Sequence, residues 1–133
     1  NFKNIVDYVT IQSLGNAVDF GDEQVTVYSR GASSNSTRGV LSGGYGTPND
    51  KLMELFTIHT TGNGVDFGEL NRSGFGRAGT SSPITGLHAS GTGGTTDIEK
   101  ITLATLGNSI DFGDLVEAAT YGRGMSASHG GMI

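Results

Sequence analysis

A nine-residue phrase that occurs three times constrains this chain more than any other feature. It reads LGNAVDFGD at 14–22, TGNGVDFGE at 61–69 and LGNSIDFGD at 106–114. An acid lies twelve positions before the aspartate of each Asp-Phe-Gly, and an aromatic residue followed two positions later by Arg lies beyond it. The aspartates are 47 and 45 positions apart, at Asp19, Asp66 and Asp111. The chain is therefore a threefold tandem repeat, in which each unit must pack against its neighbours to bury a core.

Each of the three units, approximately 1–46, 47–93 and 94–133, contains four short strand candidates. The first is the β-branched run that ends at Ile11, Ile58 or Leu103. The second follows the Asp-Phe-Gly, as in Glu23 to Arg30, and the third is a Ser/Thr-rich stretch. The fourth begins at Val40, Leu87 or Met132. No sustained helical pattern occurs, and Ile98 to Leu106, which could be read as a helix, has β-rich counterparts in the other units. The sequence predicts one all-β domain.

Composition excludes several classes of protein. Of 133 residues, 23 are Gly and none is Cys or Trp, so disulfide scaffolds and Cys-based zinc sites are excluded. No apolar run approaches the length of a membrane span. The net charge is −5 and no basic stripe occurs, so the sequence predicts no nucleic-acid partner.

Four strands and about 45 residues per unit are typical of a propeller blade. Gly43-Gly44-Tyr45, a spacer, a β-branched strand and the later aromatic and Arg resemble the kelch repeat, with Phe67 where kelch blades usually carry Trp. The phrases VDYVTIQSLGNAVDFGD, SNSTRGVLSGGYG and SASHGG are similar to kelch-like repeats in virion proteins of tailed bacteriophages. This resemblance implies a kelch-like β-propeller and a place in a capsid decoration or a tail fibre.

Three blades do not close a propeller, because closed rings have about four to eight. The chain must therefore self-associate or belong to a longer polypeptide, and a homodimer would complete a six-bladed ring. The alternative architecture is the β-trefoil, which is also threefold and closes within one chain of this length.

The repeated Asp-Phe-Gly is expected to be structural, with Asp binding backbone N–H groups in a turn, Phe filling the gap between blades and Gly permitting positive φ. These residues are Asp19, Phe20, Gly21, Asp66, Phe67, Gly68, Asp111, Phe112 and Gly113. The kinase motif of the same letters is excluded, because its companion motifs are missing.

The repeated Arg30, Arg77 and Arg123 are the candidate ligand-binding residues. They could line a ring that grips carboxylates or acidic sugars. The competing interpretation, which we favour, is that they hold blades together by binding carbonyl groups or acids.

Other motifs carry less. Gly74 to Gly79 spells the dinucleotide fingerprint, but a strand rather than a helix is expected after it. Acids three apart, such as Asp19 with Asp22, form at best a weak calcium site. His59, His88 and His129 occupy non-equivalent positions, and no nucleophile elbow accompanies the serines. We expect no catalytic residue, no metal and no cofactor.

The resemblance implies a structural or adhesive component of a phage particle, located in the virion or outside cells, and the absence of a recognisable catalytic constellation predicts that it is not an enzyme. Its expected partners are a second copy, other virion proteins and a glycan of the host surface, and it would act in assembly or host attachment. The alternative is a free lectin-like propeller that binds glycans, against which the absence of Trp counts. An enzyme is the third hypothesis.

Overall fold

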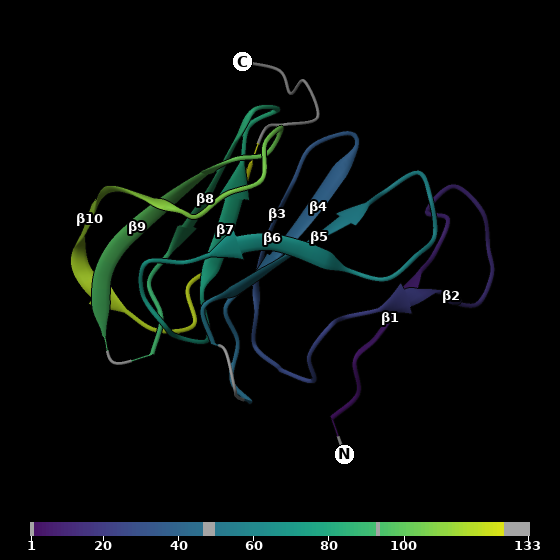
Figure 1. Cartoon of the computed structure of the whole chain (residues 1–133), viewed down its shortest axis with the longest axis horizontal. Coiled ribbons are helices and arrows are strands. Elements are labelled where there is room, and N and C mark those ends of the chain that lie inside the picture. The colour runs from purple at the N-terminus through teal and green to yellow at the C-terminus, as the bar shows by residue number, and fades with distance from the viewer. Residues whose placement is uncertain (1, 47–49, 93, 127–133) are drawn as a thin grey trace.

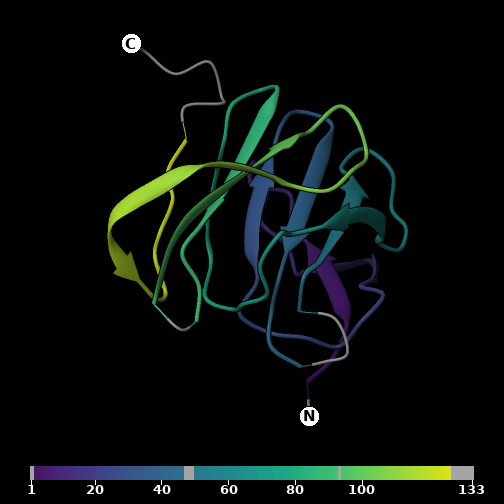
Figure 2. The ribbon, with the colours of Figure 1, turned by 60° about the vertical axis from the view of Figure 1, so that its left-hand side comes forward.

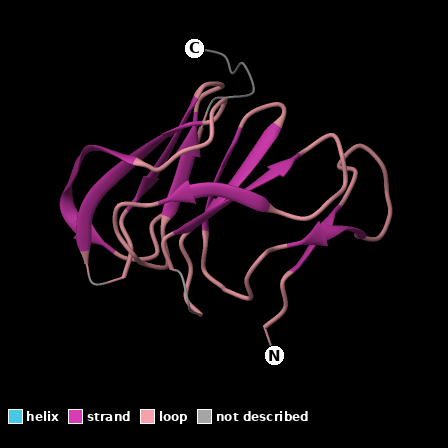
Figure 3. Cartoon of the chain, in the orientation of Figure 1, coloured by secondary structure: helices cyan, strands magenta, loops and turns pink. Residues whose placement is uncertain are grey.

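The computed structural model describes residues 2–46, 50–92 and 94–126, and this part of the chain contains strands and no helix (Figure 3). The all-β prediction is confirmed. The strand expected from Met132 and the side chain of His129 lie outside the described residues. The described strands are β1 Ile5–Tyr8, β2 Val18–Asp22, β3 Gly31–Ser34, β4 Arg38–Ser42, β5 Leu52–Thr57, β6 Val65–Glu69, β7 Ala78–Ser81, β8 Thr85–Ala89, β9 Thr95–Thr102 and β10 Ile110–Ala119.

These strands form three antiparallel sheets (Figure 1). Strands β3 to β6 form one four-stranded meander and β7 to β10 form a second, while β1 and β2 form a two-stranded sheet. We number the sheets in chain order: the first is β1 and β2, the second is β3 to β6 and the third is β7 to β10. The first sheet lies at one side of Figure 1 and β9 and β10 at the other. Each complete sheet takes two strands from one sequence unit and two from the next, so sheets and sequence units are offset by half a unit.

The Asp-Phe-Gly motif lies within a strand in all three units, so the expectation of a turn for Asp19, Asp66 and Asp111 is wrong. Each phenylalanine is the extra residue of a β-bulge, because the aspartate before it and the glycine after it face adjacent residues of the partner strand. The glycine has φ of 153° at Gly21 and 141° at Gly68. The Asp and Gly of the motif indicated a turn, but a β-bulge within a strand also favours glycine.

The second strand of each unit begins earlier than expected, within the Asp-Phe-Gly motif, and in the third unit β10 continues to Ala119, into the expected range. In the first unit the strand is β2, and Glu23 to Arg30 is a connection with bends and a single bridge between Tyr28 and Tyr45. The reading of Ile98 to Leu106 as β rather than helix is confirmed, since β9 covers its first half.

The main core lies between the second and third sheets. Val40, Met53 and Phe67 of the second sheet pack with Ile101 and Leu103 of the third. Phe67 is 2% exposed, as expected. Phe20 is half-buried, and Phe112 is 56% exposed, so equal burial of the three phenylalanines is wrong. Phe112 is exposed because no further sheet covers β10 within the described residues.

Successive sheets are joined by one repeated contact, which we call the Gly-Asn clasp. Between the first and second sheets, Gly62 N donates to Phe20 O at 2.7 Å and Asp22 N donates to Asn63 Oδ1 at 3.0 Å. Between the second and third sheets, the next copy of the motif makes the same bonds, Gly107 N to Phe67 O at 2.8 Å and Glu69 N to Asn108 Oδ1 at 3.0 Å. The repeated phrase is thus conserved along the chain because its first half binds the second half of the preceding copy.

The clasp explains the glycine in the first two bulges, Gly21 and Gly68. A Cβ at Gly68 would lie 2.4 Å from the carbonyl oxygen of Gly107, which no side chain tolerates. Strands β3 and β7 of the second and third sheets also lie against each other (Figure 2). Their backbones are in close contact, since a Cβ at Gly79 would lie 1.8 Å from the carbonyl oxygen of Ala32. Backbone contact between sheets therefore requires the high glycine content.

Candidate functional site

In the first and second units, a bend sends an aromatic residue outward and an arginine inward. The residue between them has a left-handed backbone, with φ of 63° at Ser29 and 71° at Gly76. Tyr28 remains 38% exposed, whereas the Arg30 side chain is 5% exposed. The sequence pattern aromatic-x-Arg therefore encodes two opposite surfaces, and each is a candidate site.

The inward surface holds Arg30 in a buried ion-pair network. Its Nη1 donates to Glu54, whose side chain is fully buried, and to Glu23 at 2.5 Å. Its Nη2 donates to the carbonyl oxygen of Leu52 at 3.1 Å. Burial raises the pKa of Glu23, opposed by the bond from Arg30. Arg30 thus joins the approach to the second sheet to β5 in the middle of that sheet.

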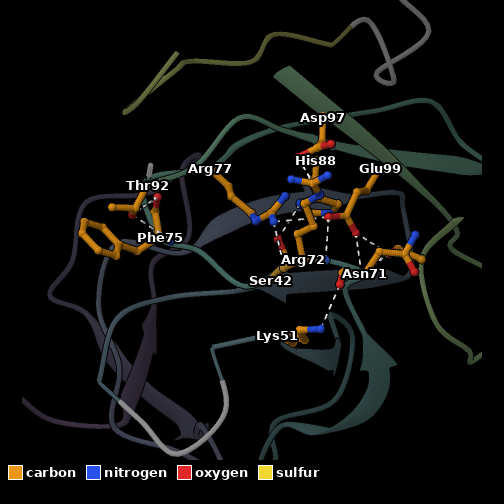
Figure 4. A network of polar contacts seen from close by, with 11 residues as sticks. Ser42, Lys51, Asn71, Arg72, Phe75, Arg77, His88, Thr92, Asp97 and Glu99 are labelled. Atoms are coloured by element: carbon orange, nitrogen blue, oxygen red, sulfur yellow. Dashed lines mark hydrogen bonds and ion pairs between the residues drawn. The ribbon is translucent and has the colours of Figure 1, made fainter. Parts of the chain in front are cut away.

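Arg77 occupies the equivalent place in the third sheet (Figure 4). Its Nη2 lies 3.2 Å from Glu99 Oε1 and donates to the carbonyl oxygen of Arg72 at 2.7 Å, and both charged side chains are at most 3% exposed. Glu99 also accepts from the backbone N of Asn71 at 2.8 Å. Burial lowers the pKa of Arg77, opposed by Glu99. A large anion cannot reach a guanidinium enclosed in this way.

Arg123 has no such partner in the described chain. It is exposed and bonds only the carbonyl oxygens of Tyr121 and Gly122. The acid that corresponds to Glu54 and Glu99 is Asp7 in β1, which is also exposed. The structure therefore brings two of the three candidate arginines to equivalent internal sites and leaves the third open.

His88 forms a second buried polar cluster. Its Nδ1 lies 2.6 Å from the hydroxyl of Ser42 and its Nε2 lies 3.0 Å from that of Ser33, and the three residues are at most 5% exposed. Burial, with a smaller contribution from Arg77, lowers the pKa of His88 to about 4. A neutral imidazole with both nitrogens bonded to serines ties β8 to the second sheet.

The remaining sequence motifs do not gather. Within the described residues, no group of three or more metal-ligating side chains converges. Gly74 to Gly79 leads into β7, a strand, so the helix that a dinucleotide fingerprint requires does not follow it. In that same part of the chain, no helix is long and apolar enough to cross a membrane.

The outward surface carries a continuous row of aromatic rings, which sequence reasoning did not assign a role. The centroids of successive rings are 4.5, 5.3, 5.0 and 6.0 Å apart. Phe2, Tyr45 and Tyr121 are 66%, 52% and 56% exposed. We call this the aromatic row, and it consists of Phe2, Tyr28, Tyr45, Phe75 and Tyr121.

Hydrogen bonds hold the backbone that carries the aromatic row. Tyr28 and Tyr45 exchange both backbone hydrogen bonds, at 3.1 and 2.9 Å. The backbone of Phe75 is bonded in both directions by the hydroxyl of Thr92, as Figure 4 shows. The repeated aromatic before each Arg was the available signal for this surface. Tyr45 and Phe2 lie outside that spacing, and only the fold adds them.

No protein-family model matches this chain, and no curated protein matches it either.

Proposed function

We propose that this chain is a non-enzymatic, kelch-like propeller module that acts in assembly or attachment of a tailed-phage particle, with the aromatic row as its contact surface. The propeller architecture is supported by two four-stranded meanders stacked through one repeated clasp, with β3 against β7. The phage setting rests on the resemblance of the repeats. In this setting the protein acts in the virion or outside cells.

The observation that carries the binding role is a row of five neighbouring aromatic rings, of which four are exposed and Phe75 is half-buried. Exposed apolar surface of this kind costs solubility, and it marks sites that contact a partner. The charged residues that could act on a substrate are instead enclosed in structural pairs, as Arg77 and Glu99 are. A rigid surface with aromatic anchors is typical of a binding module.

Glycan binding is the second candidate function, and the aromatic row favours it. Sugar rings present apolar C–H faces that pack on aromatic rings, and tyrosine adds a hydroxyl for the polar rim. Although the chain lacks Trp, the row offers three tyrosines on one surface. A free lectin-like module would therefore use the same residues as a virion component.

Truncation of one exposed ring tests the binding role. Tyr45→Ala should weaken binding to a panel of defined polysaccharides or to purified virion proteins by about 10-fold or more, as truncation of an aromatic anchor does. Tyr45→Phe keeps the ring and should retain most of the binding, and Ile84→Ala removes an exposed residue outside the row and should change nothing. Binding by Tyr45→Ala equal to that of the parent would refute the assignment of the surface.

Mass spectrometry of virions tests the phage setting separately. Virions purified from the source of this sequence should contain the chain in stoichiometric amounts. EDTA should leave both folding and binding unchanged, because no metal is required. Loss of either on chelation would contradict the metal-free proposal.

A further inference from the structure

The two ends of the molecule are complementary halves of a contact that the chain already makes twice. The Gly-Asn clasp joins the first sheet to the second and the second to the third. The third sheet presents its own bulge at Phe112 and Gly113, with no neighbour on Gly113. The first sheet presents an unused Gly15-Asn16, and residues 7–18 that surround it are exposed.

Apolar exposure follows the same division. Val9 and Ile11 in the first unit are 57% and 90% exposed, while their counterparts in the third unit, Ile101 and Leu103, are 2% and 0% exposed. The third unit's Phe112 is 56% exposed, while its counterpart Phe67 is 2% exposed against those same two residues. These exposed residues therefore correspond to residues that are fully packed between the second and third sheets, whereas between the first and second sheets Phe20 is half-buried and Ile58 is 42% exposed.

The charges divide in the same way. The second and third sheets each contain a buried pair, Arg30 with Glu54 and Arg77 with Glu99. The third pair is split, with Arg123 beyond the third sheet and Asp7 in β1. The inward arginine and the central acid of a blade are thus at opposite ends of one chain.

Within the described residues, the first sheet has two strands where the other sheets have four. In the second and third sheets, β5 and β9 pair on their inner side with β4 and β8, whereas β1 pairs only with β2. An apolar groove of about 600 Å³ lies between the first and second sheets, and its lining includes Val6, Phe20, Val40 and Phe56. Gly124 of the same chain also lines this groove and lies beside β7, since a Cβ on it would meet the carbonyl oxygen of Gly79.

From these observations we infer that the two ends dock on each other in a second copy of this chain, so that two chains close head to tail. The first sheet of each copy then packs against the third sheet of the other. Gly15-Asn16 of one copy clasps Phe112-Gly113 of its partner copy, and Asp7 pairs with Arg123. This inference rests on the propeller architecture proposed above, with two chains of three units forming a six-bladed ring.

Light scattering with variants at the free ends tests the inference. The parent should have twice the 13.7 kDa mass of one chain. Phe112→Asp and Ile11→Asp introduce charges where the single chain is exposed, so each should fold and be monomeric. Ile84→Asp, at a site that is 66% exposed and outside both ends, should leave the dimer intact.

Charge reversal gives a second, independent readout. Asp7→Arg and Arg123→Asp should each weaken association at least 10-fold, because each places like charges at both junctions. The double variant restores opposite charges and should recover most of the association. A parent that is monomeric at all concentrations, a mass well above that of two chains, or a dimer indifferent to the end variants would overturn the inference. The binding proposal is judged separately, since the aromatic row is measured by Tyr45→Ala.

Discussion

The acids and arginines of the buried pairs contribute more to stability than exposed charged residues of the same type. Glu99 accepts bonds from the backbone N of Asn71 and pairs with Arg77, and it lies almost wholly out of solvent. Removal of one partner of such a pair leaves an uncompensated buried charge. The environment of the repeated arginine therefore decides its role. Arg30 and Arg77 are buried beside an acid, whereas Arg123 is exposed.

Neutralisation of this acid should be costly. Glu99→Gln should lower the free energy of unfolding by about 3 kcal/mol, the magnitude expected when a buried arginine loses its partner. Arg72→Ala breaks the 3.2 Å pair with Asp97, but the Arg72 side chain is 62% exposed, and its loss should cost below about 1 kcal/mol. Urea denaturation of the two variants measures the difference. Equal costs would contradict the structural role given to Glu99.

His88 should make stability fall in acid. In the unfolded chain a histidine binds its proton near pH 6.5, whereas the folded chain holds the pKa of His88 at about 4. The unfolded state therefore binds more protons between these values, and the free energy of unfolding falls as pH drops from 6.5 towards 4, by about 3 kcal/mol from this residue.

Urea denaturation at pH 7 and pH 4.5 checks this expectation. His88→Gln should lose most of the pH dependence, and His59→Gln, at an exposed site, should keep it. The comparison with the parent isolates His88 from Glu23, whose raised pKa contributes in the opposite direction because its folded form holds a proton longer as pH rises. An unchanged slope in His88→Gln would contradict the prediction.

At the scale of elements, the bulged strand is the unit that the sequence repeats. Phe67 in β6 packs between two sheets, while the same residue in β10 is open to solvent. Phe67→Ala should destabilise the chain by about 3–5 kcal/mol at any protein concentration. Phe112→Ala should cost little in dilute solution and more as concentration rises, because only a second copy covers it. Thermal unfolding at two concentrations distinguishes these cases, and a concentration-independent cost at Phe112 would contradict the docking of copies.

Much of the bulged strand could be predicted from sequence, and what could not be predicted has physical causes. The repeat fixed the all-β class and the equivalence of Asp19, Asp66 and Asp111, because equivalent residues fold alike. It could not distinguish a turn from a bulge, since both need Gly and a polar neighbour. The unequal burial of Phe112 follows from its place in the last sheet, which local sequence does not encode. The aromatic row escaped notice because Tyr45 joins it only through pairing with Tyr28.

At the scale of the whole molecule, one contact accounts for both the fold and the proposed assembly. The Gly-Asn clasp holds three sheets in a row, and the row ends in one unused clasp half on each side. A ring of two chains would cover both halves and present two copies of the aromatic row. Avidity from two such surfaces would strengthen attachment without any new contact.

Disulfide trapping between two single-cysteine variants tests the clasp between copies most directly, because the parent has no cysteine. The internal clasp places Asn108 beside Glu69, so Asn16 of one copy should lie beside Asp114 of another. When Asn16→Cys and Asp114→Cys chains are mixed and oxidised, a disulfide-linked heterodimer should form rapidly, and neither variant alone should crosslink at that rate. Crosslinking of the mixture no faster than that of either variant alone would contradict the account.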